Sequence, residues 1–191
     1  MFIQTEDTPN PDSLKFVPSD IVICEKGTRQ FKDKDEAKKG SPLAFELFKI
    51  KGVSSIFFGH DFITVNKDIK TDWAAIKTEI MAAIVDFFMT GKEVLNPEDK
   101  AEDKSSDQDD DDVVKQIKEL IEIKVRPAVA MDGGDIVYQD FKDGIVYLEL
   151  KGSCSGCPSS TITLKSGIES MLKHYIPEVE SVEQINEGED Y

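Results

Sequence analysis

An acidic segment in the middle of the chain, residues 97–112, constrains the fold more than any other feature. It contains no aromatic or branched aliphatic residue, and its nine carboxylates and two lysines give a net charge of −7. Such a polar, self-repelling segment cannot bury enough apolar surface to fold. We therefore predict a flexible acidic linker spanning roughly 20 to 24 Å, which joins a domain at residues 1–96 to a domain at residues 113–191. A plain solvated tether is favoured over a specific acidic docking tail.

The charge and hydropathy of the 191-residue chain exclude several classes of protein. The formal net charge is −15 at pH 7, which opposes both nucleic-acid phosphates and an anionic membrane face. No apolar run approaches the roughly 18 residues of a membrane span, and the first residues do not resemble a signal or transit peptide. Three cysteines do not indicate a structural disulfide set. We expect a soluble chain in a reducing compartment, with protein partners, no nucleic acid and no membrane.

The first domain is predicted to be a mixed, mostly antiparallel unit. Ser41 and Pro42 are a typical N-cap and first-turn proline for a short helix over residues 43–50. Apolar residues recur at helical spacing from Trp73 to Phe88, and Gly91 is expected to end that second helix. Apolar clusters indicate five strands, at residues 2–5, 14–17, 21–24, 53–58 and 62–66.

The second domain is predicted to have the order α-β-β-α-β. An amphipathic helix covers residues 113–125 until Pro127 ends or kinks it. Two strands then flank a hairpin signal, a second helix follows the run KGSCSGCPSS, and a last strand closes the domain. The expected strands are at residues 136–141, 145–150 and 179–185. The predicted fold class is therefore α+β, with two small mixed domains.

Cys154 and Cys157 form a CxxC motif between a predicted strand and the start of a predicted helix, where Pro158 suits the first helical position. Unpaired backbone N–H groups and the helix dipole at such a position stabilise thiolates or an anionic group. Four interpretations follow from the spacing. The motif is a dithiol redox pair, half of a zinc site, half of an iron-sulfur site, or two unengaged thiols.

The number of available ligands helps to choose among these interpretations. His174 lies at the far end of the helix, about 21 Å from its start at a rise of 1.5 Å per residue. His60 and Cys24 belong to the other domain, while Asp132 and Asp135 fit a tight connection into the next strand better than a ligand set. One chain thus offers two convincing thiolates where a cluster needs four. The simplest way to complete the ligand set is to bring together two chains related by a two-fold axis.

Longer runs around these residues resemble one family closely. VRPAVAMDGGDI at residues 125–136 and GSCSGCPSSTITLKSGIE at 152–169 are similar to the C-terminal domain of the NifU-like, or Nfu-type, iron-sulfur scaffold and carrier proteins. TEDTPNPDSLKFVP at 5–18, SPLAFELFKIKGVSSIFFGHDFITV at 41–65 and the helix from Trp73 to Met89 resemble the N-terminal domain of the Nfu branch. The resemblance covers both predicted domains and is far more specific than a bare CxxC.

The resemblance implies a carrier rather than an enzyme. Cys154 and Cys157 match the two cluster-ligating cysteines of the family, which implies a [4Fe-4S] cluster bridged between two subunits and delivered to apo iron-sulfur proteins. A [2Fe-2S] form is left open. The N-terminal domain is interpreted as a recognition module for cluster donors or acceptors. A thiol-disulfide oxidoreductase and a structural zinc-bridged dimer are the alternatives. We expect a bacterial cytoplasmic location, or the mitochondrial matrix if a leader has been removed.

Overall fold

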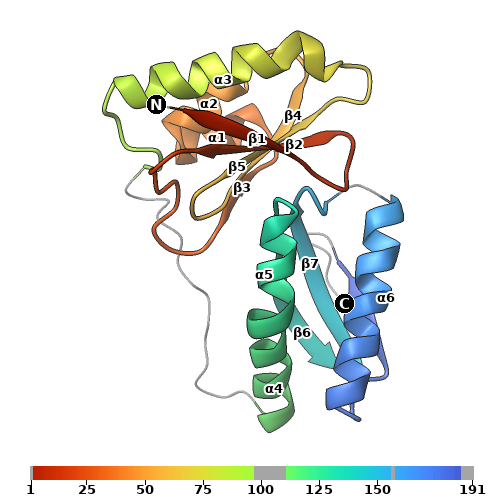
Figure 1. The fold of residues 1–191 in the computed structure, drawn as a ribbon. Coiled ribbons are helices and arrows are strands. Elements are labelled where there is room, and N and C mark those ends of the chain that lie inside the picture. Colours follow the sequence, from red (N-terminus) through yellow and green to blue (C-terminus); the bar gives the residue numbers. More distant parts are fainter. Residues whose placement is uncertain (1, 97–110, 156–157, 186–191) are drawn as a thin grey trace. The chain divides into compact units, whose positions relative to one another are not determined.

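The computed structural model describes residues 2–96, 111–155 and 158–185 (Figure 1). These residues form two compact units, one on each side of the acidic segment. Both units combine helices with a β-sheet, so the predicted α+β class is confirmed. Within the described ranges, no helix is both long and apolar enough to cross a lipid bilayer.

The first unit is an antiparallel sheet with helices packed on one face. The strand order is β1-β2-β5-β4-β3, and every neighbouring pair is antiparallel. Figure 1 shows the helices of this unit gathered over the same side of the sheet. In chain order the elements are β1 (Ile3–Asp7), β2 (Ser13–Pro18), β3 (Arg29–Phe31), α1 (Lys34–Gly40), α2 (Pro42–Leu47), β4 (Val53–Phe58), β5 (Ile63–Lys67) and α3 (Trp73–Met89).

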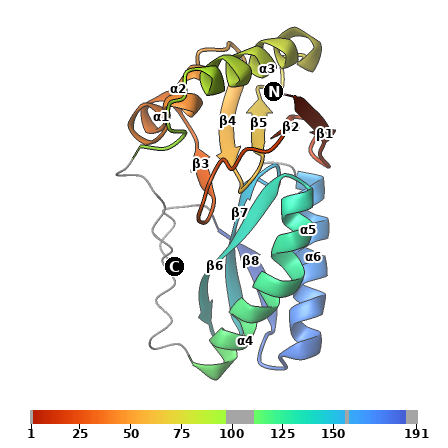
Figure 2. The ribbon, with the colours of Figure 1, turned by 60° about the vertical axis from the view of Figure 1, so that its left-hand side comes forward.

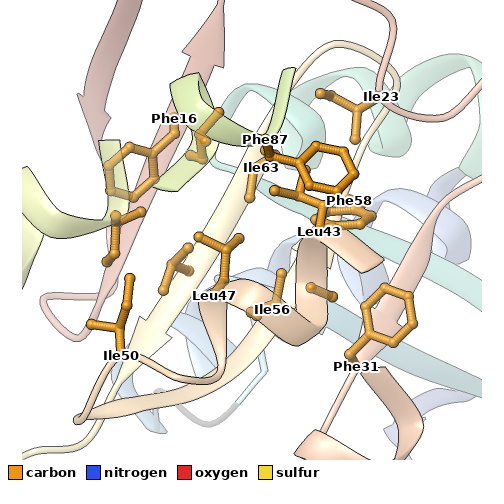
Figure 3. Packing of buried hydrophobic residues seen from close by; sticks show 14 of the residues in the cluster. Phe16, Ile23, Phe31, Leu43, Leu47, Ile50, Ile56, Phe58, Ile63 and Phe87 are labelled. Atoms are coloured by element: carbon orange, nitrogen blue, oxygen red, sulfur yellow. The ribbon is translucent and has the colours of Figure 1, made fainter. Parts of the chain in front are cut away.

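The core of this unit lies between the sheet and helices α2 and α3 (Figure 3). The Ser41 side chain accepts the Ala44 N–H and Pro42 opens α2, as predicted. In α3 the buried positions recur every three or four residues, at Ile76, Ile80, Ile84 and Phe87. Phe16, Phe58 and Ile63 of the sheet are fully buried against the helices and contribute roughly 2 kcal/mol each by leaving water.

The predicted strand at residues 21–24 is wrong. The N–H groups of Ile23 and Cys24 both donate to the carbonyl oxygen of His60, at 2.7 and 3.3 Å, so these two buried residues lie in a loop that is bonded to the β4–β5 turn. The edge strand β3 and helix α1 were not predicted. Helix α1 is polar and buries only Ala37 and Gly40, so it carries no apolar periodicity.

The second unit has helices along one face of a three-stranded sheet of order β6-β7-β8 (Figure 2). Strands β6 and β7 are antiparallel, whereas β8 runs parallel to β7 after the crossover through α6. This is the predicted α-β-β-α-β order. Its elements are α4 (Asp112–Leu120), η2 (Ile121–Val125), α5 (Arg126–Met131), β6 (Gly134–Lys142), β7 (Ile145–Gly152), α6 (Pro158–Tyr175) and β8 (Ser181–Gln184).

Pro127 does not end the first helix. The chain stays helical from α4 into α5 and widens into the π-helical turn η2 just before the proline. Proline lacks an N–H and its ring crowds the preceding turn, and a wider turn accommodates both effects. The helix also begins one residue earlier than predicted, because the Asp111 carboxylate accepts the N–H of Asp112. The rest of the predicted linker, residues 97–110, lies outside the described residues.

Candidate functional site

Cys154 lies in the connection between strand β7 and helix α6. Its side chain is 7% exposed and it forms no disulfide. Helix α6 begins at Pro158, as predicted, so the connection leads to the positive end of a helix dipole. Cys157, the other predicted ligand, lies outside the described residues. The sequence prediction for that residue therefore stays a prediction.

Gly134, the first residue of β6, lies directly against Cys154. A Cβ atom at Gly134 would lie 2.8 Å from Cys154 Sγ and 2.7 Å from the carbonyl oxygen of Lys151. The sheet register places Gly134 opposite Gly152, so two glycines face each other where the strands end. The absent side chain creates the space that the cysteine occupies.

Ser153 fastens the cysteine loop to the turn between α5 and β6. Its backbone N–H donates to the Gly133 carbonyl at 3.2 Å, and its Oγ donates to the Asp132 carbonyl at 2.5 Å. Ser153 Oγ also lies 3.8 Å from Cys154 Sγ, and the residue is only 2% exposed. Ser155 contributes a second, local bond from its Oγ to the Gly152 carbonyl, at 2.8 Å. The loop is therefore held by both backbone and side-chain bonds.

The aspartates of the MDGGD run serve the turn, as the sequence predicted. Gly133 has a φ of 81°, a left-handed conformation that glycine adopts at little cost. The Asp135 carboxylate is 5% exposed and receives two bonds from Arg126, while its Oδ1 also accepts the Ile136 N–H at 2.8 Å. The hydrogen bonds that Arg126 donates to Asp135 raise the pKa of the Arg126 guanidinium above its ordinary value. Asp135 is thus committed to an ion pair rather than to a metal.

The other ligand candidates lie outside the Cys154 loop. His174 lies in the last turn of α6, at the far end of the helix that starts near the site. Cys24 and His60 lie in the first unit, where His60 Nδ1 is 2.9 Å from the Cys24 carbonyl oxygen. Burial raises the pKa of the Cys24 thiol to about 11, so it stays protonated at neutral pH. Across the described ranges, no three His, Cys, Asp or Glu residues are grouped closely enough to hold a metal ion.

Sequence reasoning missed the residues that support the cysteine. Gly134, Ser153 and Arg126 were not singled out, although the paired glycines and the serine beside Cys154 are visible in the sequence. Their roles depend on the pairing of β6 with β7, which brings residues 134 and 152 together across the sheet. The sequence signal that could have identified these residues is a pair of short runs of small residues, Gly133–Gly134 where β6 begins and Gly152–Ser153 where β7 ends.

Comparison with known proteins assigns the class. Residues 3–91 match the family model "Scaffold protein Nfu/NifU N terminal", and residues 117–183 match "NifU-like domain". These two matches lie on the two compact units and define a two-domain scaffold of the Nfu/NifU class.

Curated relatives narrow the family. The chain is 52% identical over 190 residues to the human protein named NFU1 iron-sulfur cluster scaffold homolog, mitochondrial, and covers 74% of its length. It is 50% identical over 190 residues to the protein of that name from Drosophila ananassae, of which it spans 66%. A solution structure of the NifU-like protein from Saccharomyces cerevisiae is 32% identical, with a TM-score of 0.46, over 51% of this chain and 86% of the other. The chain belongs to the NFU1-type family of iron-sulfur cluster scaffold proteins.

Proposed function

We propose that the protein holds a [4Fe-4S] cluster between two copies of the chain and passes it to apo iron-sulfur proteins. Cys154 and Cys157 of each copy are the ligands. The protein acts as a carrier, and the cluster is its cargo rather than a resident catalytic group. The shape of the Cys154 loop supports this proposal most directly, because backbone bonds hold the thiol against Gly134, where the lack of a side chain makes room for the sulfur.

Ligand counting supports the sharing of one cluster by two chains. Iron-sulfur clusters of this type take four thiolates, and each chain supplies only the two of its CxxC motif. No histidine or carboxylate group of the described residues completes the set. A two-fold axis through the site gives four ligands, in two symmetry-related pairs, from two identical chains.

Transfer then proceeds by exchange of thiolates. A thiolate of the acceptor forms a bond to one iron while the bond from that iron to Cys154 or Cys157 breaks. The released cysteine takes up a proton, and repetition of this step moves the whole cluster. A site that lies between two chains is opened when they separate, which favours release to an acceptor with a complete ligand set.

The cluster type and the cellular location are also part of the proposal. A [2Fe-2S] cluster needs the same four thiolates, so it is the alternative cargo. The relatives are named mitochondrial, and we assign the protein to mitochondria rather than to the bacterial cytoplasm that its sequence first indicated. Its partners are then apo iron-sulfur proteins, which accept the cluster, and upstream assembly proteins, which donate it. The N-terminal domain recognises these partners.

Anaerobic reconstitution with iron and sulfide, followed by metal analysis, tests the proposal. We expect about four iron and four sulfide for every two chains. Both are lost in Cys154→Ser and in Cys157→Ser and kept in Cys24→Ser, the matched control. The loaded protein should then activate an apo [4Fe-4S] protein in the presence of a chelator. Disulfide cycling without metal uptake would instead identify an oxidoreductase, and zinc that iron cannot replace would identify a structural dimer.

A further inference from the structure

The hydroxyl of Ser153 occupies a position between two different acceptors. On one side it reaches the Asp132 carbonyl at 2.5 Å, and on the other it lies 3.8 Å from Cys154 Sγ. The residue is almost completely buried, so water does not replace either contact easily. Its backbone N–H is bonded separately to the Gly133 carbonyl at 3.2 Å. The hydroxyl can therefore turn while the backbone of the loop stays in place.

A hydroxyl carries one proton, so it donates to one acceptor at a time. In this structure the proton is directed to the Asp132 carbonyl, which leaves only a lone pair facing the sulfur. That arrangement suits a thiol, whose S–H is able to donate to the oxygen. Iron binds the thiolate, which has no proton to donate and is itself a good acceptor. The arrangement that suits an empty site is therefore unfavourable for a loaded one.

We propose that Ser153 is a positioning residue whose hydroxyl changes acceptor, from the Asp132 carbonyl in the empty protein to the Cys154 sulfur in the cluster-loaded protein. This inference rests on the proposed function. In the loaded state the new bond stabilises the iron-bound sulfur, while the α5–β6 turn loses the bond from the Ser153 hydroxyl and keeps the one from its backbone N–H. When the cluster leaves, the bond to Asp132 forms again. Ser153 thereby helps to set how firmly the cargo is held.

Hydrogen bonds to ligating groups have large effects on metal affinity. Loss of such an outer partner typically costs 10 to 100-fold in affinity. We therefore expect Ser153→Ala, in the full chain, to lose its cluster to an iron chelator roughly tenfold faster than wild type. Ser170→Ala is the control, because the Ser170 hydroxyl donates to the Ser166 carbonyl within helix α6 at 2.8 Å and is not part of the cysteine loop. Its half-time for iron loss should equal that of wild type.

A spectroscopic measurement separates this role from simple support of the loop. Resonance Raman spectra of the loaded wild-type protein in H₂O and D₂O should show an isotope shift of the iron–cysteine stretching band. That shift should be smaller in Ser153→Ala and unchanged in Ser170→Ala. The wild-type comparison needs no variant, so a band without an isotope shift overturns the inference even if Ser153→Ala fails to fold.

The outcomes distinguish this inference from the proposed function. Equal half-times for Ser153→Ala and wild type, or a wild-type band without an isotope shift, overturn the role of Ser153 and leave the carrier intact. A wild-type chain that takes up no cluster overturns both.

Discussion

Arg126 and Asp135 form a two-pronged ion pair beside the cysteine loop, with Nε 2.9 Å from Oδ1 and Nη2 3.0 Å from Oδ2. Arg126 begins α5, and Asp135 directly follows Gly134, the residue that lies against Cys154. The pair thus joins the first residue of α5 to the second residue of β6, the two elements that flank the turn to which Ser153 is bonded. It fixes the position of the turn, and through the turn the position of the cysteine loop.

Replacing Arg126 with methionine should destabilise the second unit. The substitution leaves the buried Asp135 carboxylate without its cation, at a cost of roughly 3 kcal/mol, the lower end for such pairs because Arg126 is a third exposed. Urea unfolding, monitored through the near-ultraviolet signal of tyrosine, measures this loss of stability in the second unit, since all four tyrosines lie at or after residue 138. Glu122→Gln is the control, because that carboxylate is mostly exposed and its pair contributes about 0.5 kcal/mol. Equal losses in both variants would show that the Asp135 pair has no special role.

Gly134→Ala should displace the cysteine loop. The added methyl group would meet Cys154 Sγ and a backbone carbonyl at under 3 Å, and the carbonyl cannot move without moving β7. We expect a loss of about 1 to 3 kcal/mol, together with reduced cluster retention after reconstitution. Gly167→Ala is the matched control in α6, where a Cβ meets nothing within 4 Å. That variant should be neutral or more stable by about 0.5 to 1 kcal/mol. A Gly134→Ala chain that holds iron as wild type does would refute the steric account.

Raising the pH should weaken the first unit through Cys24. Burial raises the pKa of this thiol from 9.0 to about 11. Between these values the unfolded chain releases the proton while the folded chain keeps it, so stability is lost as the pH rises from 9 to 11. Below pH 9 the contribution is constant.

The Cys24 effect is measured against Cys24→Ala, which removes the thiol but leaves other titrating groups unchanged. The stability difference between wild type and variant should shrink by about 2 kcal/mol from pH 8 to pH 11. Fluorescence of Trp73 follows the unfolding of the first unit alone, because it is the single tryptophan of the chain. A difference that stays constant over this range would mean that the thiol ionises in the folded unit as easily as in water.

The sequence predicted the parts of the fold that local patterns determine. The Ser41–Pro42 start of α2, the stripe of α3 and the hairpin strands β4 and β5 all follow from caps or periodicity. Residues 21–24 are as apolar as a strand, yet apolar residues indicate burial and not strand pairing. The N–H groups of Ile23 and Cys24 donate to the His60 carbonyl in the β4–β5 turn, a contact between segments distant in sequence.

The candidate site was predictable only in part, because it too depends on contacts between segments that are distant in sequence. The spacing of Cys154 and Cys157 is local and was visible at once. The glycine that makes room for Cys154 and the carbonyl that receives the Ser153 hydroxyl lie about 20 residues away. They reach the cysteine because β6 pairs with β7 in one particular register. The candidate ligands can be identified from residue type alone, whereas the residues that hold Cys154 in place can be identified only once the pairing of β6 with β7 is known.

Native mass spectrometry of the anaerobically reconstituted full chain tests the central claim most directly. The account predicts a dimer that carries a single [4Fe-4S] cluster, alongside a monomer that carries no metal. Cys154→Ser and Cys157→Ser should give only the metal-free monomer under the same conditions. A monomer that carries a complete cluster, or a dimer that persists unchanged in both cysteine variants, would contradict a cluster shared between two chains.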